Sequence, residues 1–117
     1  MGRLWRATIN SWNGFRVAFR SEAAFRQELA VFIPAVPLAF VVAEEGWKRL
    51  ALIGVLVLVM IVELLNTAIE KLADRVNLKI DPQIGHVKDV GSSAVLLVLI
   101  IAGAAWLLAL GERLGLL

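Results

Sequence analysis

Three long stretches without charged residues divide the chain, at 29–43, 50–62 and 90–111. The last stretch would form about 33 Å of α-helix, which is enough to cross a hydrocarbon core of about 30 Å. The first two stretches are shorter, so each must extend past its bounding charges to cross a membrane. The pattern therefore predicts one domain, 1–117, with three transmembrane helices at about 23–45, 48–76 and 86–112.

The segment before the first apolar stretch has the pattern of an amphipathic helix at 1–20. On a helical wheel, one arc is polar: Arg3, Arg6, Asn10, Asn13, Arg16 and Arg20. The opposite arc is apolar: Leu4, Trp5, Trp12, Phe15 and Phe19. Such a helix lies in the plane of the membrane interface and is attracted to anionic lipids. A basic targeting sequence is the alternative interpretation, but no cleavage site follows and no cleaved signal is expected. The predicted fold class is an all-α membrane protein with a surface helix and three transmembrane helices.

Composition supports a membrane protein. Hydrophobic residues make up 60% of the chain and mean hydropathy is +0.81, whereas soluble domains contain roughly 45–50% apolar residues. With 0 cysteines, disulfide and thiolate chemistry are excluded. Nine of the 12 Lys and Arg residues precede the first charge-free stretch or lie between the second and third stretches. The positive-inside rule therefore places the N-terminus in the cytoplasm and the C-terminus outside.

Extending the first two spans forces Glu28 and Glu63 to the membrane boundary. A carboxylate at apolar depth is costly unless it is paired, hydrated or neutralised, so such residues are candidates for a functional site. The alternative is that both side chains only mark the ends of spans near the headgroups.

The second span continues as a polar stripe. At 100° per residue, five polar side chains share about 100° of arc: Glu63, Asn66, Thr67, Glu70 and Asp74. Three carboxylates on one face favour a bound cation, and hard oxygen ligands completed by substrate phosphate suit Mg²⁺. A solvated helix face would explain Asp74 and Glu70, but it explains Glu63 poorly because Val62 and Leu64 flank that residue.

Two helix starts carry further signals. Ser21 is expected to cap the first spanning helix, with Glu22 in its first turn. The third span is expected to open at Lys88, where hydroxyls and free helix amides form an anion site. The chain contains no Gly-x-x-x-x-Gly-Lys-Ser/Thr loop, so the standard soluble nucleotide-binding fold does not apply.

Three motifs, EAAFRQE at 22–28, ELLNTAIE at 63–70 and KDVGSS at 88–93, resemble in order and spacing the signature stretches of the prokaryotic integral-membrane diacylglycerol kinases. The resemblance covers nearly the whole chain. It implies a homotrimer in the bacterial inner membrane, with active sites shared between subunits, that transfers the γ-phosphate of ATP to diacylglycerol and gives phosphatidic acid. No nucleic-acid partner is expected.

The resemblance also implies roles for individual residues. Glu63 would be the catalytic base and would contact the lipid, and Glu22 and Glu70 would bind Mg²⁺. Further contacts to ATP would come from Arg3, Asn10, Asn66, Lys79, Asp81, Lys88 and Asp89. Further contacts to the lipid would come from Ser11, Arg26, Glu28 and Ser92.

Other functions fit parts of the pattern. An undecaprenol kinase would share the fold and the reaction, although Gln27 and Glu28 look more like the diacylglycerol branch. A small transporter coupled to cations or protons would use intramembrane carboxylates. It predicts carboxylates near the bilayer midplane, whereas these cluster at the cytoplasmic ends of the spans. A structural membrane subunit would give no reason for the carboxylate stripe.

Overall fold

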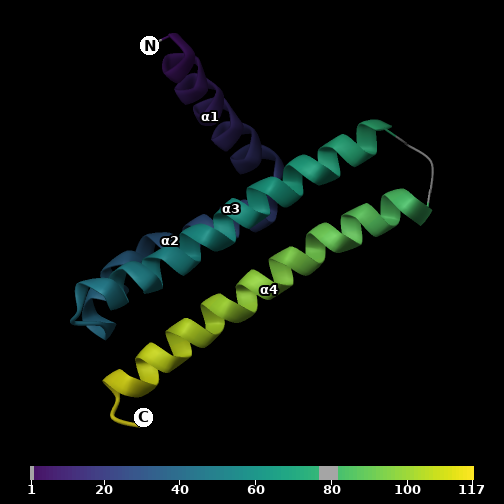
Figure 1. The fold of residues 1–117 in the computed structure, drawn as a ribbon. Helices are drawn as coiled ribbons and strands as arrows, with labels where there is room; N and C mark the ends of the chain where they lie inside the picture. The colour runs from purple at the N-terminus through teal and green to yellow at the C-terminus, as the bar shows by residue number, and fades with distance from the viewer. Residues whose placement is uncertain (1, 77–81) are drawn as a thin grey trace.

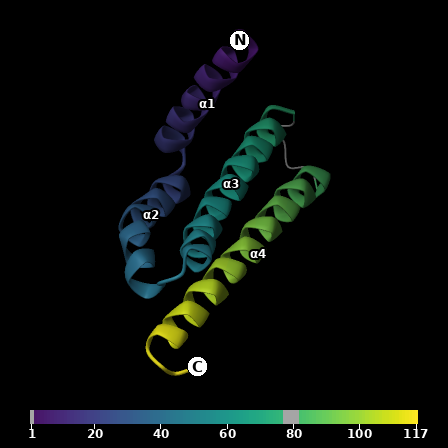
Figure 2. The same ribbon diagram turned by 60° about the vertical axis from the view of Figure 1, so that its left-hand side comes forward.

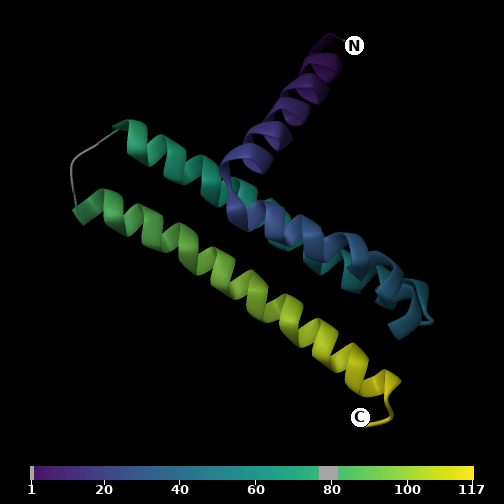
Figure 3. The same cartoon turned by 180° about the vertical axis from the view of Figure 1, so that it is seen from behind.

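The computed structural model describes residues 2–76 and 82–117, and these form four helices connected by short segments (Figure 1). The helices are α1 (Gly2–Ser21), α2 (Ala23–Val42), α3 (Gly46–Val76) and α4 (Pro82–Arg113). Helices α3 and α4 run antiparallel along most of their length, and α2 packs against α3. Helix α1 projects away from this bundle in all three views (Figures 1, 2 and 3). Lys79 and Asp81 lie outside the described residues.

Helices α2, α3 and α4 are each long and apolar enough to cross a membrane, at 20, 31 and 32 residues. Helix α1 is not among these candidate spans. In the most apolar windows of the three spans, only 22%, 28% and 17% of the residues are buried inside the protein. The remaining apolar surface therefore faces outward, as it must in a bilayer. The predicted all-α membrane fold is confirmed.

Small side chains let the three spanning helices approach one another closely. One cluster of buried residues lies where α2 ends and α3 begins: Ala39, Val42, Ala43, Leu52 and Ala109. A second cluster joins the middles of α3 and α4: Val59, Val98 and Ala102. The indole nitrogen of Trp106 also donates a hydrogen bond to the carbonyl of Leu52 (3.1 Å), which ties α4 to α3. The core is thus a thin layer along α3, and it extends toward the polar stripe.

Basic side chains hold the opposite end of the bundle together. Arg49 donates to the carbonyl of Ala43 (2.8 Å), and its guanidinium lies 4.7 Å from the centre of the Phe40 ring. Arg113 donates to the carbonyl of Val41 (3.2 Å). Cationic donors at these positions satisfy carbonyls that the end of α2 leaves without helical partners. This end of the bundle is therefore held by specific contacts and not only by lipid.

The junction between α1 and α2 differs from the prediction. Ser21 is the last residue of α1 and donates its hydroxyl to the carbonyl of Val17 (2.8 Å), so it does not cap α2. The N-cap residue is Glu22, which has an extended backbone (φ −120°, ψ 110°) and makes no side-chain capping bond. The expectation that Ser21 caps this helix was wrong because α1 continues through Ser21 and leaves only one residue between the two helices.

Helix α4 begins at Pro82, earlier than the predicted start near residue 86. Proline is favoured in the first turn of a helix because its missing N–H needs no helical partner there. The amides of 88–93 therefore lie inside the helix, and the hydroxyl of Ser93 donates to the carbonyl of Asp89 (3.0 Å). The expectation of free amides at Lys88 was wrong, and any anion contact there must come from side chains.

The distribution of Lys and Arg predicts the orientation of this fold. We expect the N-terminus and the connection between α3 and α4 in the cytoplasm, and the C-terminus outside. Reporter fusions made after Val76 and after Leu117 test the prediction. The first fusion should report a cytoplasmic location and the second an external one. The prediction is wrong if both fusions report the same side.

Candidate active site

The polar stripe of α3 lies partly inside the protein. Glu63, Asn66 and Thr67 are buried, with 8%, 7% and 6% of their surface exposed. Glu70 is half-buried, whereas Asp74 is exposed. Exposure to solvent therefore explains the polar residue at the end of the stripe, Asp74, but not the carboxylate at its beginning, Glu63. The charged groups that act on this buried carboxylate are Glu22, at the start of α2, and Glu70 on α3.

Four carboxylates from α2 and α3 interact electrostatically, and we call Glu22, Glu28, Glu63 and Glu70 the carboxylate cluster. Glu63 is affected by the charges of Glu70 and Glu22, and Glu28 is affected by the charge of Glu63. A cation lies at the edge, where Lys71 Nζ is 4.0 Å from Glu22 Oε1. Within residues 2–76 and 82–117, no three His, Cys, Asp or Glu side chains are placed to hold a metal ion together. A metal held by one or two of these carboxylates would be completed by water and substrate phosphate, as is common for Mg²⁺.

Asn66 connects the cluster to α4. Its Nδ2 donates to Glu70 Oε1 (3.0 Å). Its Oδ1 is buried without a hydrogen-bond donor among the described residues, and so is Glu28 Oε1. Asn66 Oδ1 lies so close to Gly91 on α4 that a Cβ at that position would overlap it. Sequence reasoning missed Gly91, although an isolated glycine within a helix often marks a close approach.

Helix α4 contributes Lys88, which forms an ion pair with Asp74 (2.5 Å). The charge of Glu70 also acts on Lys88, so this cation lies beside the carboxylate cluster. Asp89 and Ser92 are exposed on the same helix. The structure thus brings Lys88 to the cluster, while Asp89 and Ser92 face outward.

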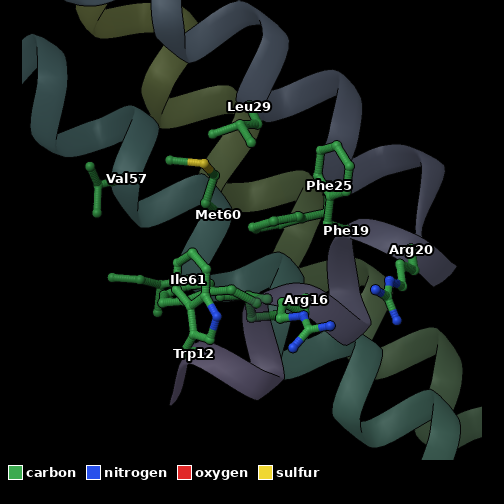
Figure 4. A pocket seen from close by; sticks show the side chains of 11 residues that line it. Trp12, Arg16, Phe19, Arg20, Phe25, Leu29, Val57, Met60 and Ile61 are labelled. Atoms are coloured by element: carbon green, nitrogen blue, oxygen red, sulfur yellow. The ribbon is translucent and has the colours of Figure 1, made fainter. Parts of the chain in front are cut away.

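An apolar groove of about 640 Å³ lies between α1, α2 and α3 (Figure 4). Its wall includes Leu29 and Leu64, the chain neighbours of Glu28 and Glu63. The remaining lining residues are Trp12, Phe15, Arg16, Phe19, Arg20, Phe25, Val57, Met60 and Ile61. The cationic groups of Arg16 and Arg20 give this apolar wall a polar edge (Figure 4). The pattern along the chain did not reveal this groove because three helices build it.

The predicted site residues of α1 are not gathered at the carboxylate cluster of the same chain. Arg3 and Asn10 are exposed, and the free end of α1 points away from the bundle (Figure 3). Ser11 donates to the carbonyl of Ala7 (2.8 Å) and lines a hollow of about 360 Å³ that Thr67 also lines. Only the middle of α1 therefore reaches the polar face of α3 within one chain.

Arg26, a predicted lipid contact, is turned toward α1. Its Nη1 donates to the carbonyls of Phe19 (2.7 Å) and Arg20 (3.1 Å). These carbonyls end α1 and have no helical partners of their own, so the guanidinium caps the helix. Arg26 thereby fixes the angle at which α1 meets α2, next to the groove.

Comparison with known proteins decides the family. The model of the family described as prokaryotic diacylglycerol kinase matches residues 9–110. The chain belongs to the prokaryotic diacylglycerol kinase family. It is 41% identical to a diacylglycerol kinase of Escherichia coli (strain K12) over 113 residues, covering 97% of this chain and 93% of the relative. It is also 41% identical to a diacylglycerol kinase of Pseudomonas aeruginosa over 104 residues, which covers 89% and 85%.

A diacylglycerol kinase of Haemophilus influenzae is 36% identical over 103 residues, covering 88% of this chain and 87% of the relative. The predicted resemblance is confirmed, and with it the assignment as an ATP-dependent lipid kinase. The family match contains all three motifs, whereas Arg3 precedes it. The carboxylate cluster of this diacylglycerol kinase therefore lies within the matched region.

Proposed function

We propose that the carboxylate cluster is the active site at which this kinase phosphorylates diacylglycerol, at the cytoplasmic boundary of the membrane. The observation that carries this proposal is the position of Glu63. It is a buried carboxylate in a polar cluster, and its neighbour Leu64 lines an apolar groove. A lipid kinase needs this combination, because its acceptor hydroxyl is attached to apolar chains while its phosphate donor is highly charged.

The acyl chains of diacylglycerol lie in the groove between α1, α2 and α3. Phe25 and Leu29 of α2 and Met60 of α3 supply its apolar wall. Arg16 and Arg20 face the phospholipid headgroups at its edge, where basic residues are stabilised by anionic lipid. The glycerol hydroxyl then reaches the level of Glu28 and Glu63.

Glu63 accepts the proton of that hydroxyl as the new oxygen–phosphorus bond forms and the bond from the γ-phosphorus to ADP breaks. The transition state of phosphoryl transfer is loose, so the protein contributes mainly by positioning and by balancing charge. Lys88 offsets the charge of the phosphates once ATP competes with Asp74 for its ammonium group. Asn66 and Asp89 complete the contacts to the nucleotide.

The donor set fits a Mg²⁺ ion. Glu22 and Glu70 both act electrostatically on Glu63, and the cations nearest to them are Lys71, beside Glu22, and Lys88, on which Glu70 acts. Mg²⁺ is commonly held by one or two carboxylates together with water and substrate phosphate. When bound, the ion neutralises charge on the phosphate oxygens. Glu22 and Glu70 hold it, and the hydrogen bond from Asn66 fixes one oxygen of Glu70.

Conversion of Glu70 to Gln should raise the Mg²⁺ concentration needed for half-maximal activity by about 10-fold or more. Glutamine retains an oxygen that can accept the hydrogen bond from Asn66. The substitution therefore removes the negative charge of Glu70 and keeps this hydrogen bond. Glu22→Gln should act in the same direction. Titration of the purified kinase with Mg²⁺ measures both effects, and Glu44→Gln, at the other end of the bundle, is the control. An unchanged Mg²⁺ requirement in both Glu22→Gln and Glu70→Gln would remove them from the metal site.

The lipid acceptor is tested by direct comparison. The purified kinase is given Mg²⁺ and ATP labelled in the γ-phosphate, with diacylglycerol or undecaprenol in separate micelles. We expect rapid labelling of diacylglycerol and slow labelling of undecaprenol. Faster labelling of undecaprenol would assign the chain to the alternative substrate and leave the fold and the reaction unchanged.

The kinase assembles as a homotrimer in which neighbouring copies complete each active site. Three spans form a thin bundle, and the free end of α1, which carries Arg3, projects away from the bundle of its own chain. A ring of identical copies repeats one contact at every interface and would bring α1 of one copy to the cluster of the next.

A further inference from the structure

The contact between α3 and α4 at Asn66 and Gly91 is closer than ordinary side-chain packing. A Cβ on Gly91 would overlap Asn66 Oδ1 and would lie 3.4 Å from Asn66 Cγ. Gly85 and Gly103 lie on the same helix, and a Cβ on either has nothing within 4 Å. Glycine is disfavoured inside a helix because of its backbone entropy. Of these three glycines, only Gly91 occupies a position where an added Cβ would force a neighbouring group, the carboxamide of Asn66, to move.

The contact explains why Asn66 Oδ1 has no hydrogen-bond donor. Asn66 is 7% exposed, so water does not replace the missing partner across most of its surface. The oxygen lies against Gly91, on the side where a Cβ would stand. The amide oxygen is thus held against α4, and Nδ2 is directed toward Glu70 Oε1 (3.0 Å).

The opposite orientation of the carboxamide is unfavourable toward Glu70. Rotation by half a turn would direct the oxygen of Asn66 at the carboxylate of Glu70, where two electron-rich groups repel. The charge of Glu70 therefore selects the orientation in which Nδ2 donates to its carboxylate (3.0 Å) and Oδ1 lies against Gly91.

We infer that Gly91 is a positioning residue of the kinase reaction. Its missing side chain allows the carboxamide of Asn66 to lie against α4 and to hold the Glu70 carboxylate in the place where the reaction needs it. The inference rests on the proposed role of Glu70 at the active site. It assigns to Gly91 a contribution through Asn66, without contact to ATP or lipid.

Gly91→Ala tests this inference, with Gly85→Ala as the matched control on the same helix. The added methyl group should push the carboxamide away from Glu70. Displacement of a positioned group by about 1 Å can cost about 10²-fold in rate. We expect Gly91→Ala to lower turnover by about 10-fold to 10²-fold and to raise the Mg²⁺ requirement, whereas Gly85→Ala should stay within about twofold of the parent chain.

A double-mutant cycle with Asn66→Ala tests whether Gly91→Ala acts through the side chain of Asn66. Removal of the Asn66 side chain also removes the overlap, so adding Gly91→Ala to Asn66→Ala should lower neither turnover nor the midpoint of thermal unfolding further. Thermal unfolding is measured in detergent without metal, where catalysis plays no part. Because the double variant has no overlap, it should fold even if Gly91→Ala alone does not.

Two results would overturn the inference. One is a Gly91→Ala variant that matches Gly85→Ala in turnover, Mg²⁺ requirement and unfolding midpoint. The other is a Gly91→Ala effect that is equally large with and without the Asn66 side chain. Failure of the proposed metal site would look different: Glu70→Gln would leave the Mg²⁺ requirement unchanged, while the cycle between Gly91 and Asn66 would still show coupling in metal-free unfolding.

Discussion

We expect Glu63→Gln to lower the turnover of diacylglycerol by about 10²-fold or more, because the amide keeps the size of the side chain but cannot accept the hydroxyl proton from the substrate as the proposed base does. Glu63 is buried, and the carboxylates of Glu70 and Glu22 interact with it. The substitution also removes one negative charge from a crowded cluster. Folding should therefore be maintained or improved while catalysis is lost.

Two measurements distinguish the loss of the proposed catalytic base from disruption of the whole active site. ATP affinity should change by less than about threefold in Glu63→Gln, because the proposed site places this side chain at the lipid acceptor and not at the nucleotide. The control Glu44→Gln removes a carboxylate from the exposed turn at the opposite end of the bundle and should leave turnover within about twofold. A turnover near that of the parent chain in Glu63→Gln would return this residue to the role of a boundary anchor.

Mixing two inactive variants should restore activity if α1 of one copy completes the site of another. The pair is Arg3→Glu, which reverses a charge on the exposed end of α1, and Glu63→Ala, which removes the base on α3. In mixed trimers, some interfaces combine an intact α1 with an intact α3. With random assembly and one composite site per interface, activity should return to roughly one quarter of that of the parent chain.

The negative control uses two changes within one cluster. Glu63 and Glu70 lie on the same helix and interact electrostatically in one chain. Co-refolded Glu63→Ala and Glu70→Ala should therefore stay inactive, because each site then carries one defect. If the pair with Arg3→Glu also stays inactive, while the parent chain refolds fully by the same procedure, the site is confined to one subunit.

Local patterns were sufficient to predict much of this protein. Charge-free runs predicted three spanning helices because a bilayer requires long apolar segments. Helical periodicity placed Glu63 and Asn66 on one face, and both are buried. A buried carboxylate between apolar neighbours was recognisable as a candidate site because its cost in an apolar environment is large.

Features that depend on how helices pair were not predictable in the same way. The overlap at Gly91 arises only when α4 lies beside Asn66 of α3. The end of α1 was misplaced because Ser21 is a plausible cap for the next helix, and only the geometry shows its hydroxyl bonded back to Val17. Because α4 starts at Pro82, the backbone amides near Lys88 lie inside the helix. An anion at this place would therefore contact side chains and not free helix amides.

The central claim is that this chain transfers phosphate from ATP to a lipid hydroxyl. The most direct measurement follows the label from γ-labelled ATP in a reaction of the purified parent chain with diacylglycerol micelles and Mg²⁺. We expect the label to appear in phosphatidic acid, in proportion to the ADP formed, and removal of Mg²⁺ to stop its appearance. Release of the label as free phosphate, or ADP formation without labelled lipid, would show that the lipid hydroxyl is not the acceptor.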